Sequence, residues 1–146
     1  MHKKKVLLSV TGLVQEAGED EANDEMRLVT TGELSGADDS WSLRYTEAQP
    51  DGEASHEVVF TMHNGVVTMN RDGEYNTSMI FSKGSRFEGS YHTPFGALEM
   101  GVFPTQVKYH VDDDRGEVLL QYQLDIQGQY SSMREMRIRF AASRRS

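Results

Sequence analysis

The chain has 146 residues and a formal net charge of −8, so it is long enough for one domain with a sizeable core. Hydrophobic residues make up 37% of it and 13 residues are glycine, which suits a globular protein with many tight turns. The lack of cysteine excludes disulfides, thiolate metal sites and a cysteine nucleophile, and the acidic charge argues against binding to nucleic acid or to an anionic membrane.

The N-terminus resembles a signal peptide, because three lysines precede a short apolar run that ends at Val14. The residues that follow, 15–19, are polar and acidic and offer no cleavage site with small residues. The apolar run is also too short to span a bilayer. We therefore expect a first strand with a charged lead-in, and a cytoplasmic protein that does not associate with membranes.

Short segments in which apolar and polar residues alternate follow one another along the whole chain. A period of two is typical of antiparallel strands that bury one face. The predicted strands are 4–15, 26–34, 41–46, 56–63, 66–71, 75–81, 87–93, 98–102, 105–111, 117–126 and 133–141, with a bend or a sheet edge at Pro104 between 98–102 and 105–111.

The turn residues indicate how these segments connect. Asn64-Gly65 and Asp72-Gly73 are strong signals for two-residue hairpins, and such turns force neighbouring strands to pair. No segment carries the long apolar stripe of an amphipathic helix. We therefore predict an all-β, single antiparallel up-and-down β-barrel of about 8–10 strands. One domain would cover residues 1–146, with frayed ends at 1–3 and 142–146.

Three stretches carry a resemblance to a known family. They are Arg71-Asp-Gly-Glu-Tyr-Asn-Thr-Ser-Met-Ile-Phe81, Tyr91-His-Thr-Pro-Phe-Gly96 and Leu124-Asp-Ile-Gln-Gly128. Together they resemble the YwiB-like family of small bacterial proteins, over most of the chain and most clearly from 66 to 140. The resemblance implies a lipocalin-like (calycin-type) β-barrel in the cytoplasm. The family is a domain of unknown function, so the resemblance implies no activity.

Patterns that would indicate a metal site or an active site are weak. The five histidines form no close ligand pairs, so we predict no metal and no cofactor. The acidic stretch 112–117 has the wrong spacing for a calcium loop and is typical of a hairpin turn. There is no P-loop, dinucleotide fingerprint or nucleophile elbow. An enzyme would have to use the nearest set of titratable groups, which is Arg71, Glu74, His92 and Glu99.

The last predicted strand carries two arginines that could hold a carboxylate inside a barrel, since guanidinium binds that group with two hydrogen bonds. Met136, Ile138 and Phe140 share the opposite parity and would occupy the core face. We therefore expect Arg137 and Arg139 to point outward.

A better candidate for a ligand-binding lining mixes aromatic, hydroxyl, thioether and guanidinium groups on strands that are expected to be neighbours. Ligand pockets have this character, with apolar surface and few polar groups. The alternative is that these bulky side chains simply fill a narrow barrel. Arg71 would hold a polar or anionic head group. The candidate residues are Arg71, Tyr75, Thr77, Met79, Tyr91, Thr93 and Tyr122.

The function expected from the fold is non-enzymatic binding of a small, partly apolar ligand in or at the mouth of the barrel. The alternative is a filled barrel that acts as a protein-interaction or homodimeric module. Leu119 and Ile80 would contribute to that interface, because they point away from the apolar faces of their strands. A catalytic function has the least support in the sequence.

Overall fold

The computed structural model describes residues 2–16, 24–48, 55–72, 77–112 and 114–142. Nearly all of these residues lie in ten antiparallel strands. The strands are β1 (His2–Glu16), β2 (Asp24–Ala37), β3 (Ser40–Ala48), β4 (Ser55–His63), β5 (Val66–Asp72), β6 (Thr77–Phe81), β7 (Phe87–Thr93), β8 (Gly96–Val111), β9 (Arg115–Ile126) and β10 (Gln129–Ala142).

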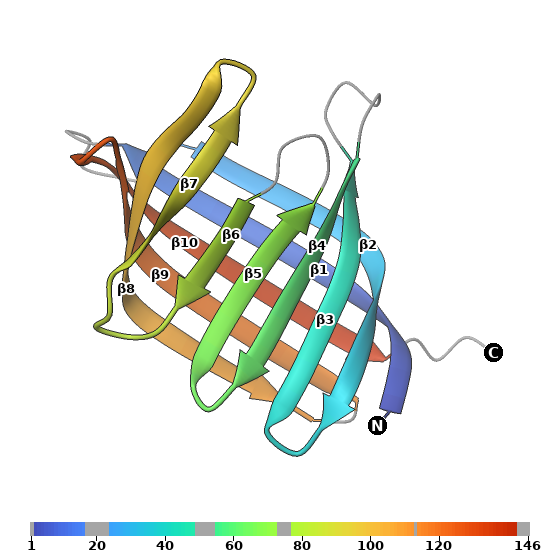
Figure 1. Cartoon of the computed structure of the whole chain (residues 1–146). Coiled ribbons are helices and arrows are strands. Elements are labelled where there is room, and N and C mark those ends of the chain that lie inside the picture. The colour runs from blue at the N-terminus through green and yellow to red at the C-terminus, as the bar shows by residue number, and fades with distance from the viewer. Residues whose placement is uncertain (1, 17–23, 49–54, 73–76, 113, 143–146) are drawn as a thin grey trace.

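The strands form one sheet in the order β6-β5-β4-β3-β2-β1-β10-β9-β8-β7. Consecutive strands pair with each other, and the first strand also pairs with the last one, so that the two edges of the sheet are β6 and β7. The sheet curls until these two edges approach each other (Figure 1). The turn between them is tied to the neighbouring strand, because the Gly84 amide donates a hydrogen bond to the Pro104 carbonyl at 3.2 Å. The result is a nearly closed barrel.

This architecture confirms the predicted all-β, up-and-down barrel. The strands extend into the ends that were expected to fray, because β1 begins at His2 and β10 ends at Ala142. Backbone pairing explains both, since His2 pairs with Gly36 of β2 and Ala142 pairs with Val6 of β1. Residues 1 and 143–146 lie outside the described residues.

Pro104 interrupts the long strand β8 as the sequence indicated. The register of β8 against β9 shifts between Pro104 and Gln106, because proline has no backbone amide to donate to a ladder. The shift also changes which parity faces inward. Val102 is buried before the irregularity, whereas Tyr109 is one of the side chains that pack against the core after it.

The apolar face of each strand fills the barrel interior. These side chains form one continuous core that holds the two walls of the barrel together. The buried members are Val6, Leu8, Val10, Leu34, Trp41, Leu43, Tyr45, Val58, Phe60, Met62, Val67, Met69, Met79, Phe81, Met100, Val102, Val118, Leu120, Tyr122, Leu124, Ile138 and Phe140.

The two ends of the barrel differ in character. At the end that holds the β4–β5 turn, the Gly65 amide donates a hydrogen bond to the Tyr109 hydroxyl of β8 at 2.8 Å, and the Phe140 ring packs directly over Gly116. These contacts fix the β4–β5 turn against β8 and cover Gly116 at this end. We call the opposite end, where β3 ends and β4 begins, the mouth (Figure 1). Within the described ranges, no helix has the length and apolar character needed to cross a membrane.

Candidate functional site

The predicted lining residues whose side chains are described all face the barrel interior. Thr77, Met79 and Tyr122 are buried and Arg71 is half-buried. Arg71 of β5 is the direct cross-strand partner of Thr77 of β6. The remaining candidates cannot be placed, because Tyr75 and the side chains of Tyr91 and Thr93 lie outside the described residues.

A carboxylate and a histidine that the sequence analysis did not single out accompany Arg71. Glu47 of β3 and His56 of β4 are cross-strand partners near the mouth. The Arg71 guanidinium lies 3.3 Å from Glu47, measured from Nε to Oε1, and its Nη2 donates to Oε2 at 3.5 Å. The His56 Nδ1 lies 3.9 Å from the same Glu47 Oε1. One carboxylate therefore serves two basic side chains.

A second arginine faces inward from the other wall. Arg134 of β10 is the cross-strand partner of Tyr122 of β9. Its Nε donates a hydrogen bond to the Ser132 hydroxyl at 3.0 Å. Among the described residues, no carboxylate oxygen lies within 4.0 Å of this guanidinium. Arg134 thus differs from Arg71, because no described residue gives it an acidic partner.

Electrostatics links the two walls at Tyr122. Burial raises the pKa of the Tyr122 phenol, while the positive charges of Arg134 and Arg71 act in the opposite direction. Both guanidinium groups are therefore close enough to act on the same phenol. The Tyr122 ring packs edge-on against Phe81, with ring centroids 5.0 Å apart.

Tyr45 has a similar position on the β3 side. Burial raises the pKa of its phenol, the Glu47 charge raises it further, and the Arg71 charge lowers it. Polar side chains from both walls thus lie together inside the mouth. We call this set the mouth cluster; its members are Tyr45, Glu47, His56, Arg71, Thr77, Tyr122, Ser132 and Arg134.

Partly exposed apolar side chains lie beside the mouth cluster. Val14 of β1 is the cross-strand partner of Arg134. Met26 of β2 is the cross-strand partner of Gly12 and thus shares the inner face with Val14, and 48% of Met26 is exposed. Ile126 of β9 is partly buried against the core. The mouth therefore offers apolar surface next to polar groups.

Three members of the mouth cluster could have been found from the strand alternation. Glu47 has the parity of the buried residues of β3, His56 has that of β4, and Arg134 has that of Met136 in β10. His56 and Arg134 lie inside the predicted strands 56–63 and 133–141, and Glu47 directly follows the predicted strand 41–46. Applying the inward parity to charged as well as apolar residues leads to all three groups.

Of the residues considered for an enzyme, the three that the structure describes do not come together. Arg71 faces the interior, whereas His92 of β7 and Glu99 of β8 are exposed next to inward-facing positions. Glu74 lies outside the described residues. In the described part of the chain, no three histidine or acidic side chains gather in a way that could hold a metal ion.

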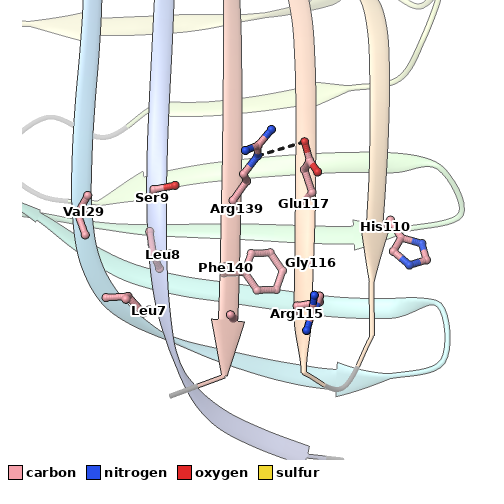
Figure 2. Close-up of a pocket in the computed structure, with 11 residues that line it drawn as sticks. Leu7, Leu8, Ser9, Val29, His110, Arg115, Gly116, Glu117, Arg139 and Phe140 are labelled. Carbon is pink, nitrogen blue, oxygen red and sulfur yellow. Dashed lines mark ion pairs between the residues drawn. The ribbon is translucent and has the colours of Figure 1, made fainter. Parts of the chain in front are cut away.

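The outer face of the sheet carries the arginines of the last strand. Arg137 and Arg139 alternate with the inward residues of β10, as expected. Arg139 forms an ion pair with Glu117 of β9, with 3.5 Å between Nε and Oε1. Arg139 and Glu117 border a groove of about 500 Å³ that crosses β2, β1, β10, β9 and β8 (Figure 2). Val29 and Leu7 supply exposed apolar surface to this groove.

Comparison with known proteins agrees with this fold. The crystal structure of the ywiB protein from Bacillus subtilis matches with a TM-score of 0.82, 19% sequence identity, and coverage of 97% of this chain and 93% of that chain. At this identity the likeness establishes the fold alone. No curated protein sequence matches the chain significantly. The model of one family matches residues 8–138. The chain therefore belongs to the family described as a domain of unknown function (DUF1934).

Proposed function

We propose that the protein binds a small, partly apolar ligand at the mouth of the barrel and does not transform it. The single observation that carries this proposal is the mouth cluster beside partly exposed, inward-facing apolar side chains such as Met26. Binding sites for small molecules combine these two kinds of surface, because the apolar part supplies affinity and the few polar groups supply orientation.

The packing of the core supports the mouth, rather than the depth of the barrel, as the place of binding. Phe60, Phe81 and Leu120 are fully buried below the mouth cluster. At the far end, the Gly65–Tyr109 hydrogen bond joins the β4–β5 turn to β8, and the Phe140 ring covers Gly116. A ligand would therefore rest on a filled floor and contact Val14, Met26 and Ile126 with its apolar part.

Native mass spectrometry of the protein purified from its own host, followed by extraction and identification of bound compounds, tests this proposal. We expect a stoichiometric small molecule. A binding assay with the extracted compound then compares two variants of β2, Met26→Asp and Val29→Asp. Met26 faces inward, whereas Val29 is 70% exposed on the outer face. Met26→Asp should weaken binding and Val29→Asp should not. An apo mass, together with no binding of simple amphiphiles, would overturn the proposal.

A second candidate function is homodimerisation through the outer face. The exposed Val29 and Leu7 on adjacent strands favour it, because together with the groove they form apolar surface that water would otherwise cover. Ile80 is also exposed, but it lies on the edge strand β6, and Leu119 is partly buried. Light scattering should report a dimer that Leu7→Lys converts to a monomer. A monomeric wild-type protein at all concentrations would dismiss this candidate.

A further inference from the structure

The two inward arginines of the mouth cluster are compensated differently. Glu47 contacts Arg71 through two pairs of atoms, at 3.3 and 3.5 Å. The hydrogen bond to the Ser132 hydroxyl is the only polar contact of the Arg134 guanidinium with the described residues. A hydroxyl compensates no charge. Since a half-buried guanidinium without a counter-ion loses part of its hydration, an anion placed against Arg134 would be stabilised there.

The surroundings of Arg134 supply further hydrogen-bond donors for such an anion. A guanidinium has five N–H groups, and Ser132 engages one of those of Arg134. The buried Tyr122 side chain is directly across the ladder from Arg134. Burial raises the pKa of this phenol, so it stays protonated at neutral pH and can donate to an oxyanion.

The charges of the cluster also set how much negative charge fits. Arg71 and Arg134 contribute two positive charges and Glu47 contributes one negative charge. One further negative charge would balance these three groups, and Glu16, the cross-strand partner of Ser132, adds a carboxylate beside them. A second negative charge would face repulsion from Glu47, because the low dielectric of a partly buried site strengthens such interactions.

We propose that Arg134, rather than Arg71, anchors the ligand, and that the ligand is an amphiphile with a singly charged oxyanion head of the carboxylate type. This proposal rests on the proposed function, since it assigns the head group and the orientation of the same ligand. The oxyanion accepts hydrogen bonds from Arg134 and Tyr122, and the apolar part lies along Val14 and Met26.

The experiment measures the binding of three probes at pH 8 by calorimetry. Decanoate carries one charge, decanol carries none, and decyl phosphate carries about two at this pH. The variants are Arg134→Gln, Arg134→Lys and Tyr122→Phe. Arg137→Gln is the matched control, because Arg137 lies on the same strand but faces outward. Circular dichroism and Trp41 fluorescence report whether each variant is folded.

We expect wild-type protein to bind decanoate more tightly than decanol or decyl phosphate. Arg134→Gln should weaken decanoate binding about 10- to 100-fold, the effect of losing a charge-assisted hydrogen bond, and leave decanol binding unchanged. Arg134→Lys keeps the charge and should lose less, Tyr122→Phe should weaken decanoate binding a few-fold, and Arg137→Gln should bind like wild type.

The other outcomes separate this inference from the proposed function. If decanoate and decanol bind equally and Arg134→Gln changes neither, the anchor is wrong although the binding function stands. If decyl phosphate binds more tightly than decanoate, the singly charged head group is wrong. If no probe binds and the purified protein carries no compound, the proposed function fails together with the inference.

Discussion

The ion pair between Glu47 and Arg71 should stabilise the barrel measurably, and its size can be bounded from the structure. Their side chains are 19% and 25% exposed, which lies between a surface pair and a fully buried one. Exposed pairs contribute about 0–1 kcal/mol, and breaking a buried pair costs about 3–5 kcal/mol. We therefore expect Glu47→Gln to destabilise the protein by about 1–3 kcal/mol.

The cost arises from what the substitution leaves behind. The Arg71 Nε is already buried without a hydrogen bond, so loss of the carboxylate leaves a half-buried charge with poorer compensation. Arg71→Met should cost a similar amount. The double variant removes both charges, so its cost should be smaller than the sum of the single costs by about 1–2 kcal/mol.

Urea unfolding at pH 8, followed by the fluorescence of Trp41, measures all three variants. Trp41 is the single tryptophan and is buried, and its Nε1 donates a hydrogen bond to the Asp38 carbonyl at 2.9 Å. Arg44 and Glu57 provide a control pair on the outer face of β3 and β4, with 3.4 Å between Nη1 and Oε1. Their side chains are 56% and 46% exposed. A Glu47–Arg71 coupling no larger than that of the control pair would refute the reasoning.

Three further substitutions test the core, a close contact and the pH dependence. Phe60→Ala removes a fully buried ring and should cost about 3–5 kcal/mol in urea unfolding; a cost below about 1 kcal/mol would mean that the core is not packed there. Gly116→Ala would drive a Cβ into the Phe140 ring and should lower stability by about 1–3 kcal/mol, which a thermal melt would show as a lower Tm. Hydrogen bonds from the side chains of Gln123, which has the larger effect, and of Arg86 lower the pKa of Asp125. Its stabilisation is therefore present above its unfolded pKa and is lost as pH falls through the folded pKa, so that Asp125→Asn should flatten the dependence of unfolding free energy on pH in the acidic range; an unchanged profile would contradict this.

Much of the fold could be predicted because period-two alternation is a local property. The segment 117–126 shows this, since its apolar parity matches the inward residues of β9 from Val118 to Leu124. A closed up-and-down barrel implies that β1 pairs with β10, but the register of this ladder could not be predicted, because it joins residues at opposite ends of the chain and no local pattern encodes it. For the same reason the sequence did not indicate that the sheet edges are β6 and β7.

The mouth cluster could be predicted from the sequence only in part, for the same reason. Alternation could place Arg134 or Glu47 on the inner face, but not at the same height in the barrel as Tyr122 and Arg71. That height depends on the register of ladders between strands that are distant in sequence, such as Arg134 against Val14. Alternation alone predicts an inward Arg71, but its pairing with Thr77 differs from the pairing with Glu74 that a two-residue turn at Asp72-Gly73 would give.

The pairing of the first strand with the last one also has a consequence for folding kinetics. In the natural chain order, the β1–β10 ladder can form only after a loop of more than a hundred residues closes, as between Val10 and Ile138, and such non-local contacts slow folding. A circular permutant that joins the end of β10 to the start of β1 by a short linker and begins in the turn between β6 and β7 would place every ladder between consecutive strands. Its native contacts would be the same but its contact order lower, so we expect it to fold faster while keeping the same barrel.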